Sequence, residues 1–120
     1  MSHFDLVAIH KFNEELHKTE YLLASYQMAK SFPALLKNKH HTLLSLVLEQ
    51  LQKLRTMSTY LRNYQQFFTS IPTENFFYRY FDRMIDLLKQ QELKVVEYQL
   101  RDFDDQLSHL LPIIETEAIA

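Results

Sequence analysis

Apolar side chains recur three and four positions apart through most of the chain, which is the spacing of one face of an α-helix. The first such face carries five apolar residues and one threonine: Ile9, Phe12, Leu16, Thr19, Leu23 and Tyr26. Opposite charges four positions apart, such as Lys11 and Glu15, lie on what the pattern makes the outer face and favour a helix. The pattern therefore predicts a first helix over residues 3–30.

Three prolines divide the chain, since a proline ends or interrupts a helix. Pro33 follows the first helix, and residues 33–41 are expected to form an ordered loop or one loose helical turn. The second apolar face consists of Leu44, Val47, Leu51, Leu54, Ser58, Leu61 and Phe68. Because this face stops shortly before Pro72, it predicts a second helix over residues 41–69.

The segment after Pro72 holds two apolar stripes that are out of register with each other. The first consists of Phe77, Phe81, Met84 and Leu88. The second consists of Leu93, Val96, Leu100, Phe103, Leu107, Leu110 and Ile114. On one continuous helix the two stripes would lie on nearly opposite sides. A turn at residues 89–92 resolves the conflict and predicts helices over residues 73–90 and 93–111.

These elements predict an all-α fold, an antiparallel up-down four-helix bundle in which residues 1–120 form a single domain. Pro112 is expected to end the last helix and to leave residues 113–120 as a frayed tail. The alternative keeps residues 73–111 as one long helix with two apolar faces. That helix would give three long helices and would need a second, intertwined chain to cover one face.

Composition excludes several classes of function but does not identify one. The chain has no glycine and no cysteine. Phosphate-cradling loops, dinucleotide fingerprints and nucleophile elbows all require glycine, and thiol catalysis and disulfides require cysteine. The formal net charge is −2, which is too balanced to favour a nucleic acid or an anionic membrane as the main partner.

The cellular location of the protein is predicted from the absence of a membrane-spanning segment and of a secretory signal. No apolar run approaches the length of about 18 residues that a membrane span needs. The first residues carry no basic stretch followed by an apolar one, so we expect no secretory signal. Together with the lack of cysteine, these features favour a cytoplasmic protein.

Histidines form the most regular polar pattern in the chain. His3, His10 and His17 are seven positions apart, so they form one row on the first helix, beside the apolar face and directed toward water. Glu14-x-x-His17 matches the Glu-x-x-His motif of di-iron bundles, but the chain has no second copy of it. We therefore expect no metal site and no cofactor.

Catalytic patterns are also weak. Ser108 and His109 are adjacent without a surrounding motif, and three aspartates at positions 102, 104 and 105 fit a solvated helix face or a docking patch for a basic partner. We expect a protein without enzymatic activity.

Aromatic residues concentrate in one short segment. Nine of the sixteen aromatic residues fall within residues 60–81, which we call the aromatic patch. Each helix of a four-helix bundle has one face toward solvent, so part of this patch should lack cover within the chain. Aromatic residues with interspersed arginines are typical of protein interfaces. The predicted interface residues are Tyr60, Tyr64, Phe68, Phe76, Phe77, Tyr78, Arg79, Tyr80 and Arg83. The competing interpretation is that the rings plug one end of the bundle beneath residues 31–41.

The leading hypothesis is a non-enzymatic interaction or regulatory protein that binds another protein, or a second copy of itself as a homo-oligomer, through the aromatic patch. A first alternative is a nucleic-acid accessory protein that uses Lys53, Arg55, Arg62, Arg79 and Arg83 with nearby tyrosines. A second alternative is a bundle that carries a metal or an apolar ligand among its helices.

Overall fold

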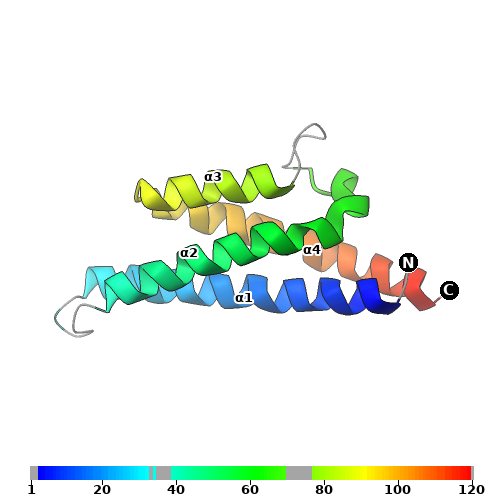
Figure 1. Cartoon of the computed structure of the whole chain (residues 1–120), viewed down its shortest axis with the longest axis horizontal. Coiled ribbons are helices and arrows are strands. Elements are labelled where there is room, and N and C mark those ends of the chain that lie inside the picture. Colours follow the sequence, from blue (N-terminus) through cyan, green and yellow to red (C-terminus); the bar gives the residue numbers. More distant parts are fainter. Residues whose placement is uncertain (1–2, 33, 35–38, 70–76, 120) are drawn as a thin grey trace.

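In the part of the chain that the structure describes, four α-helices and one 3-10 helix make up an all-α bundle (Figure 1). The computed structural model describes residues 3–32, 34, 39–69 and 77–119. The elements are α1 (His3–Ser31), α2 (His40–Met57), the 3-10 helix η1 (Ser58–Phe67), α3 (Phe77–Lys89) and α4 (Leu93–Ile119). Within the described part of the chain there is no strand, and no helix is long and apolar enough to cross a membrane.

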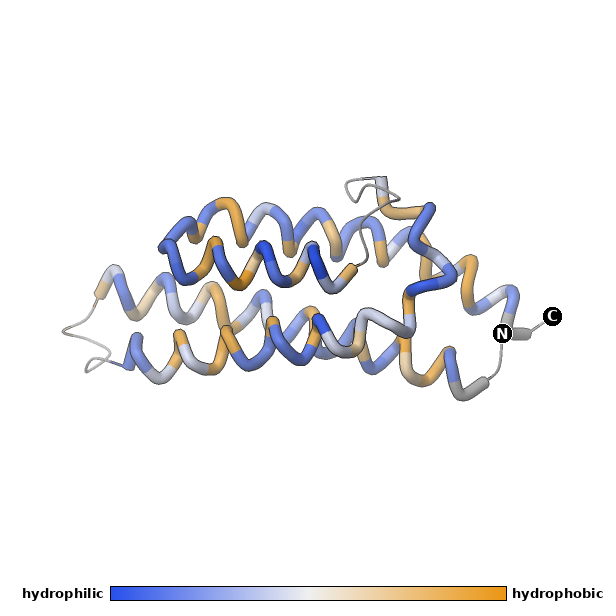
Figure 2. The backbone as a smooth tube through the Cα atoms, turned by 45° about the horizontal axis from the view of Figure 1, so that its top comes forward, coloured by the Kyte–Doolittle hydropathy of each residue, from blue (hydrophilic) through white to orange (hydrophobic). Residues whose placement is uncertain are grey.

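The helices pack as neighbours around one core. α1 packs against α2 and α4, and α3 packs against α2 and α4. Figure 1 shows α1 and α2 running in opposite directions, with both ends of the chain at the same end of the bundle. Hydrophobic positions recur at short intervals along every helix in Figure 2, as expected for helices that each bury one face.

Phenylalanine rings fill the centre of the core. The Phe103 ring lies 5.8 Å from the Phe12 ring and 5.4 Å from the Phe81 ring, measured between ring centroids. The Phe12 and Phe81 rings meet edge to face at 6.1 Å, so three helices contribute to one aromatic cluster. Nearly all residues of the predicted apolar stripes are buried, and the others, Leu44 and Leu93, are half-buried.

The predicted turn between the third and fourth helices is confirmed, and it excludes one long helix over residues 73–111. α3 ends at Lys89 and α4 begins at Leu93. Backbone N–H groups of Gln91 and Glu92 donate to the carbonyls of Leu88 and Leu87, which is a Schellman motif. Its left-handed position is usually glycine, but here Gln91 takes a φ of 65°.

The prediction of a second helix over residues 41–69 is wrong from residue 58 onward. The α-helix ends at Met57, and residues 58–67 form the 3-10 helix η1, which turns away from the α2 axis in Figure 1. Hydroxyl groups at this boundary bond the backbone: Ser58 Oγ donates to the Arg55 carbonyl at 2.6 Å, and Thr59 Oγ1 donates to the Thr56 carbonyl at 3.3 Å. Such local bonds compete with regular α-helical geometry.

The predicted end of the last helix at residue 111 is also wrong. α4 continues through Pro112 to Ile119, although a proline inside a helix removes one backbone hydrogen bond. The added turns are held by tertiary contacts. Ile114 is fully buried, Glu115 pairs with His10 at 3.2 Å, and the Tyr64 hydroxyl donates to Glu117 at 3.2 Å. Packing therefore overrides the local signal of the proline.

The remaining helix boundaries agree closely with the predicted ones. α1 ends one residue later than predicted, at Ser31. Residues 73–76 of the predicted third helix and most of the predicted loop at 33–41 lie outside the described residues. The first described residue of the third helix is Phe77, a member of the predicted stripe.

Candidate functional site

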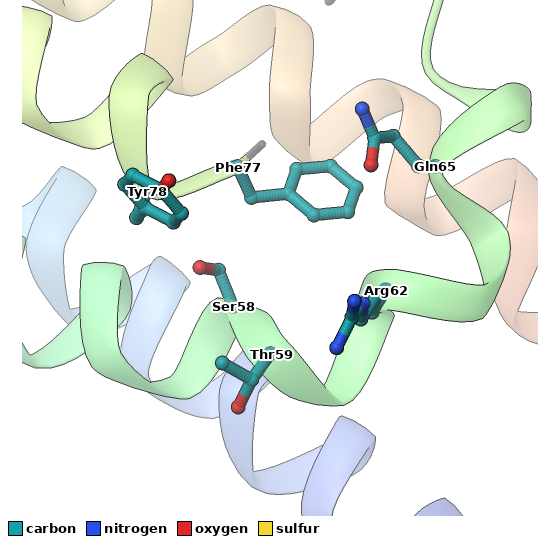
Figure 3. A pocket seen from close by; sticks show the side chains of 6 residues that line it. All are labelled: Ser58, Thr59, Arg62, Gln65, Phe77 and Tyr78. Carbon is teal, nitrogen blue, oxygen red and sulfur yellow. The ribbon is translucent and has the colours of Figure 1, made fainter. Parts of the chain in front are cut away.

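A cavity of about 260 Å³ opens between η1 and α3, inside the aromatic patch. Figure 3 shows Phe77 and Tyr78 of α3 on one side and residues of η1 on the other. The η1 residues that line the cavity are Ser58, Thr59, Arg62 and Gln65. Most of the exposed wall is apolar, so the cavity combines an aromatic wall with a few polar groups at its edge.

The three-residue period of the 3-10 helix sorts the side chains of η1 into rows. Thr59, Arg62 and Gln65 are three positions apart and all line the cavity. The row one position earlier begins with three buried residues, Ser58, Leu61 and Tyr64. In an α-helix, which has 3.6 residues per turn, the same positions would drift by about 60° at each step. The 3-10 geometry therefore aligns Thr59, Arg62 and Gln65 more closely along one wall of the cavity.

Three of the nine predicted interface residues lie inside the chain. Tyr64, Phe68 and Phe77 are buried. The Phe68 ring stacks on the Phe103 ring with centroids 4.7 Å apart and meets the Phe77 ring edge to face at 5.1 Å. These rings belong to the aromatic cluster around Phe103 in the core, and Phe77 also forms part of the cavity wall. The competing interpretation expected them at one end of the bundle beneath residues 31–41, but Figure 1 shows the end of α1 and the start of α2 at the far end from η1.

The other predicted interface residues are more accessible. Tyr80 is half-buried, and its hydroxyl donates to the Gln99 carbonyl at 3.2 Å. Phe76 lies outside the described residues. The four exposed members of the set are Tyr60, Tyr78, Arg79 and Arg83. The patch is thus divided between the core and a surface around the cavity.

The five cations of the nucleic-acid hypothesis are not equally available. Lys53 pairs with Glu15 at 3.2 Å, and Arg55 pairs with Asp82 at 2.6 Å. Arg55 also lies over the Tyr78 ring, 5.4 Å from its centroid. The three remaining arginines are exposed and make no ion pair within the described part of the chain: Arg62, Arg79 and Arg83.

Glu15 occupies a polar site in the core, although the sequence pattern placed it on the outer face. Its carboxylate accepts a hydrogen bond from Gln50 Nε2 at 2.8 Å and pairs with Lys53 and Lys11. The Gln50 hydrogen bond, with help from the two lysines, lowers the pKa of Glu15 to about 2 against the opposing effect of burial. The group is therefore ionised in the folded chain at neutral pH.

A second polar cluster, which the pattern along the chain does not predict, joins α1 to α4. His17 Nε2 lies 2.9 Å from Asp104 Oδ1, and one carboxyl oxygen of Glu20 lies within 4.8 Å of both groups. Burial, and next the neighbouring Asp104 carboxylate, raise the pKa of Glu20 to about 8. The spacing His17-x-x-Glu20 was a visible signal, but the pairing with Asp104 depends on how α4 docks against α1.

Two histidines of the row, His10 and His17, lie at the edge of α4. His10 and His17 are exposed, as predicted, and each pairs with one carboxylate of α4: His10 with Glu115 and His17 with Asp104. A cavity of about 230 Å³ lies beside Glu20 and is also lined by residues of α4, among them Leu100 and Arg101.

Comparisons of the chain with models of protein families, with curated proteins and with solved structures give no match.

Proposed function

We propose that this chain is a non-enzymatic binding protein that holds a protein partner at the cavity between η1 and α3. The recognised segment carries one apolar side chain that enters the cavity and acidic residues beside it. The observation that supports this proposal most directly is the cavity itself, which has an aromatic wall and exposed arginines close by in the sequence.

The size of the cavity fits a side chain better than a whole small-molecule ligand. Small-molecule sites have volumes of about 300–1,000 Å³, and this cavity has about 260 Å³. Tyr78 is 37% exposed and lines the cavity, and Tyr60 and Phe67 are exposed on η1. Partly exposed aromatic residues beside a pocket are typical of the anchor positions in protein interfaces.

Charge favours an acidic protein segment over a nucleic acid. Two of the five cations considered for nucleic-acid binding are already neutralised, Lys53 by Glu15 and Arg55 by Asp82. The exposed arginines at positions 62, 79 and 83 suit bidentate bonds with a few carboxylates. Arginine is also enriched at the centres of protein interfaces.

A displayed library of random peptides tests the proposal. The full chain should enrich peptides in which an apolar residue is flanked by aspartate or glutamate. Tyr78→Ala should weaken binding of these peptides by about tenfold, the usual effect of losing an interface anchor. The double variant Arg62→Glu, Arg79→Glu should abolish binding, because it reverses the charge of the arginine that lines the cavity and of the arginine next to Tyr78 in the sequence. Tyr98→Ala is the matched control, since Tyr98 is an exposed tyrosine of α4 outside the cavity lining.

Other outcomes would contradict the proposal. Peptides that bind Tyr78→Ala as tightly as the unaltered chain would place the binding surface elsewhere. Salt-sensitive binding of a generic oligonucleotide that the double variant loses would favour the nucleic-acid alternative. A concentration-dependent dimer in sedimentation experiments, dissolved by the double variant, would make the partner a second copy of the chain.

A further inference from the structure

The cluster of His17, Glu20 and Asp104 has the composition and placement of a cation site. His17 and Glu20 are three positions apart on α1, so their side chains share one face of that helix. Asp104 reaches the same place from α4, which packs against α1. Each residue offers one ligand atom, and these three atoms lie within 4.8 Å of one another.

The distances suit a small divalent ion. Metal bonds to imidazole nitrogen and carboxylate oxygen are about 2.0–2.2 Å long, so two such ligands at the tetrahedral angle of Zn²⁺ lie about 3.4 Å apart. His17 Nε2 and Asp104 Oδ1 are hydrogen-bonded at 2.9 Å and would separate by about half an ångström around an ion. The Glu20 oxygen lies within 4.8 Å of the other two ligand atoms and would move toward them, which its rotatable side chain permits.

A separate observation concerns the carboxyl group of Glu20. The Oε1 atom of Glu20 is buried and accepts no hydrogen bond within the described part of the chain. A buried polar atom without a partner is costly, and an ion or ordered water is a common explanation for one. The His17 side chain is exposed, so solvent reaches the cluster and can supply water ligands for the remaining coordination positions.

We propose that His17, Glu20 and Asp104 bind one first-row divalent cation, with Zn²⁺ the most suitable, and that water completes its coordination. Imidazole together with carboxylates suits Zn²⁺, whereas Mg²⁺ prefers sites built from oxygen alone. The ion would fasten α1 to α4. This inference is independent of the proposed binding of a protein partner, because the two sites have no lining residue in common.

The chain contains a matched control for this site. His10 lies seven residues before His17 in the same row and also pairs with a single carboxylate of α4, Glu115, at 3.2 Å. It has no second carboxylate within ligand distance among the described residues. His10 therefore shares the exposure and the ion pair of His17 but not the three-ligand arrangement.

Calorimetric titration of the full chain with ZnCl₂, after removal of metals with EDTA, tests the proposal. We expect one tightly bound Zn²⁺ per chain and much weaker binding of Mg²⁺. His17→Gln, Glu20→Gln and Asp104→Asn should each weaken Zn²⁺ binding by about tenfold or more, whereas His10→Gln should change it by less than about twofold. Cobalt(II) supplies a second readout, because its visible absorption bands should appear in the unaltered chain and be lost in His17→Gln.

Two results would overturn the proposal. The first is the absence of Zn²⁺ binding in the unaltered chain. The second is Zn²⁺ binding that His17→Gln and Asp104→Asn leave unchanged but that a variant of the adjacent His40 and His41 abolishes. The rings of that pair lie 4.1 Å apart and are the obvious adventitious ligands. Circular dichroism of each variant shows whether it is folded, and three separate ligand variants keep the test decisive if one of them unfolds.

Discussion

At the scale of single residues, Glu15 shows how a helix can bury a charged group when polar side chains surround it. The residue is 5% exposed, yet its carboxylate has three partners: Gln50 of α2, Lys53 of α2 and Lys11 of its own helix. The sequence predicted the pairing with Lys11 from its four-residue spacing. It could not predict burial, because burial depends on α2 lying against this part of α1.

The lowered pKa of Glu15 predicts a specific dependence of stability on pH. The pKa is 4.5 for an unperturbed glutamate and about 2 in the folded chain. The unfolded chain therefore takes up the proton first as the pH falls. The contribution of Glu15 to the free energy of unfolding is complete above about pH 5 and is lost progressively toward pH 2.

Glu15→Gln should be less stable than the unaltered chain at pH 7, by about 1 kcal/mol. Its disadvantage should shrink as the pH falls to 2, because the amide does not titrate. Urea unfolding between pH 2 and 7, in the presence of EDTA, measures both chains. Glu14→Gln is the control, since Glu14 is exposed and, among the described residues, pairs only with Lys11. A constant difference between Glu15→Gln and the unaltered chain at every pH would contradict the prediction.

At the scale of elements, the turn from α3 to α4 is the most demanding point of the backbone. Gln91 adopts a left-handed conformation that costs a residue with a Cβ atom about 1–2 kcal/mol. Its side chain offsets part of this cost, because its Oε1 atom accepts a hydrogen bond from the Tyr26 hydroxyl at 3.1 Å and contacts Lys30. The side chain of Gln91 thus links the turn to α1, which a glycine at this position could not do.

Two substitutions at position 91 separate the backbone effect from the side-chain effect. Gln91→Ala and Gln91→Gly both lose the bonds to Tyr26 and Lys30, but only glycine relieves the left-handed strain. Gln91→Gly should therefore be more stable than Gln91→Ala by about 1 kcal/mol in chemical denaturation. Equal stability of the two variants would mean that the turn rearranges and that the φ of Gln91 carries no strain.

At the scale of the whole molecule, the bundle is organised around Phe103. Its ring contacts phenylalanines of α1 and α3, as well as Phe68, which follows η1. Phe77 belongs to this cluster and also lines the candidate site, so one residue connects the cavity wall to the core.

Removing the central ring should destabilise the entire fold. Phe103→Ala leaves a large cavity among rings from several elements, and we expect it to lower the free energy of unfolding by about 3–5 kcal/mol. Tyr98→Ala, on the same helix but 69% exposed, should change it by less than about 0.5 kcal/mol. Thermal unfolding followed by circular dichroism gives both values. A small effect of Phe103→Ala would show that the core can collapse around the gap.

The sequence predicted the helices and the core far better than the sites. Periodicity identified nearly every buried residue of the four helices, and the shift in register near residue 90 located the turn between the last two. Local signals failed where tertiary contacts decide the outcome, as at Pro112, where buried Ile114 prolongs α4. Both sites depend on side chains from different elements, such as His17 and Asp104, and no pattern along the chain specifies how two helices dock.

The row formed by Thr59, Arg62 and Gln65 has a consequence for how this surface can change. These three residues line the cavity, while Leu61 and Tyr64 of the adjoining row are buried and Ser58 of that row contributes to both. Substitutions at Thr59, Arg62 and Gln65 can therefore alter the shape and charge of the cavity while Leu61 and Tyr64 stay in place. Selection or engineering can adjust recognition at these three positions of the 3-10 segment with little effect on folding, whereas changes at Ser58 and Phe77 would affect both.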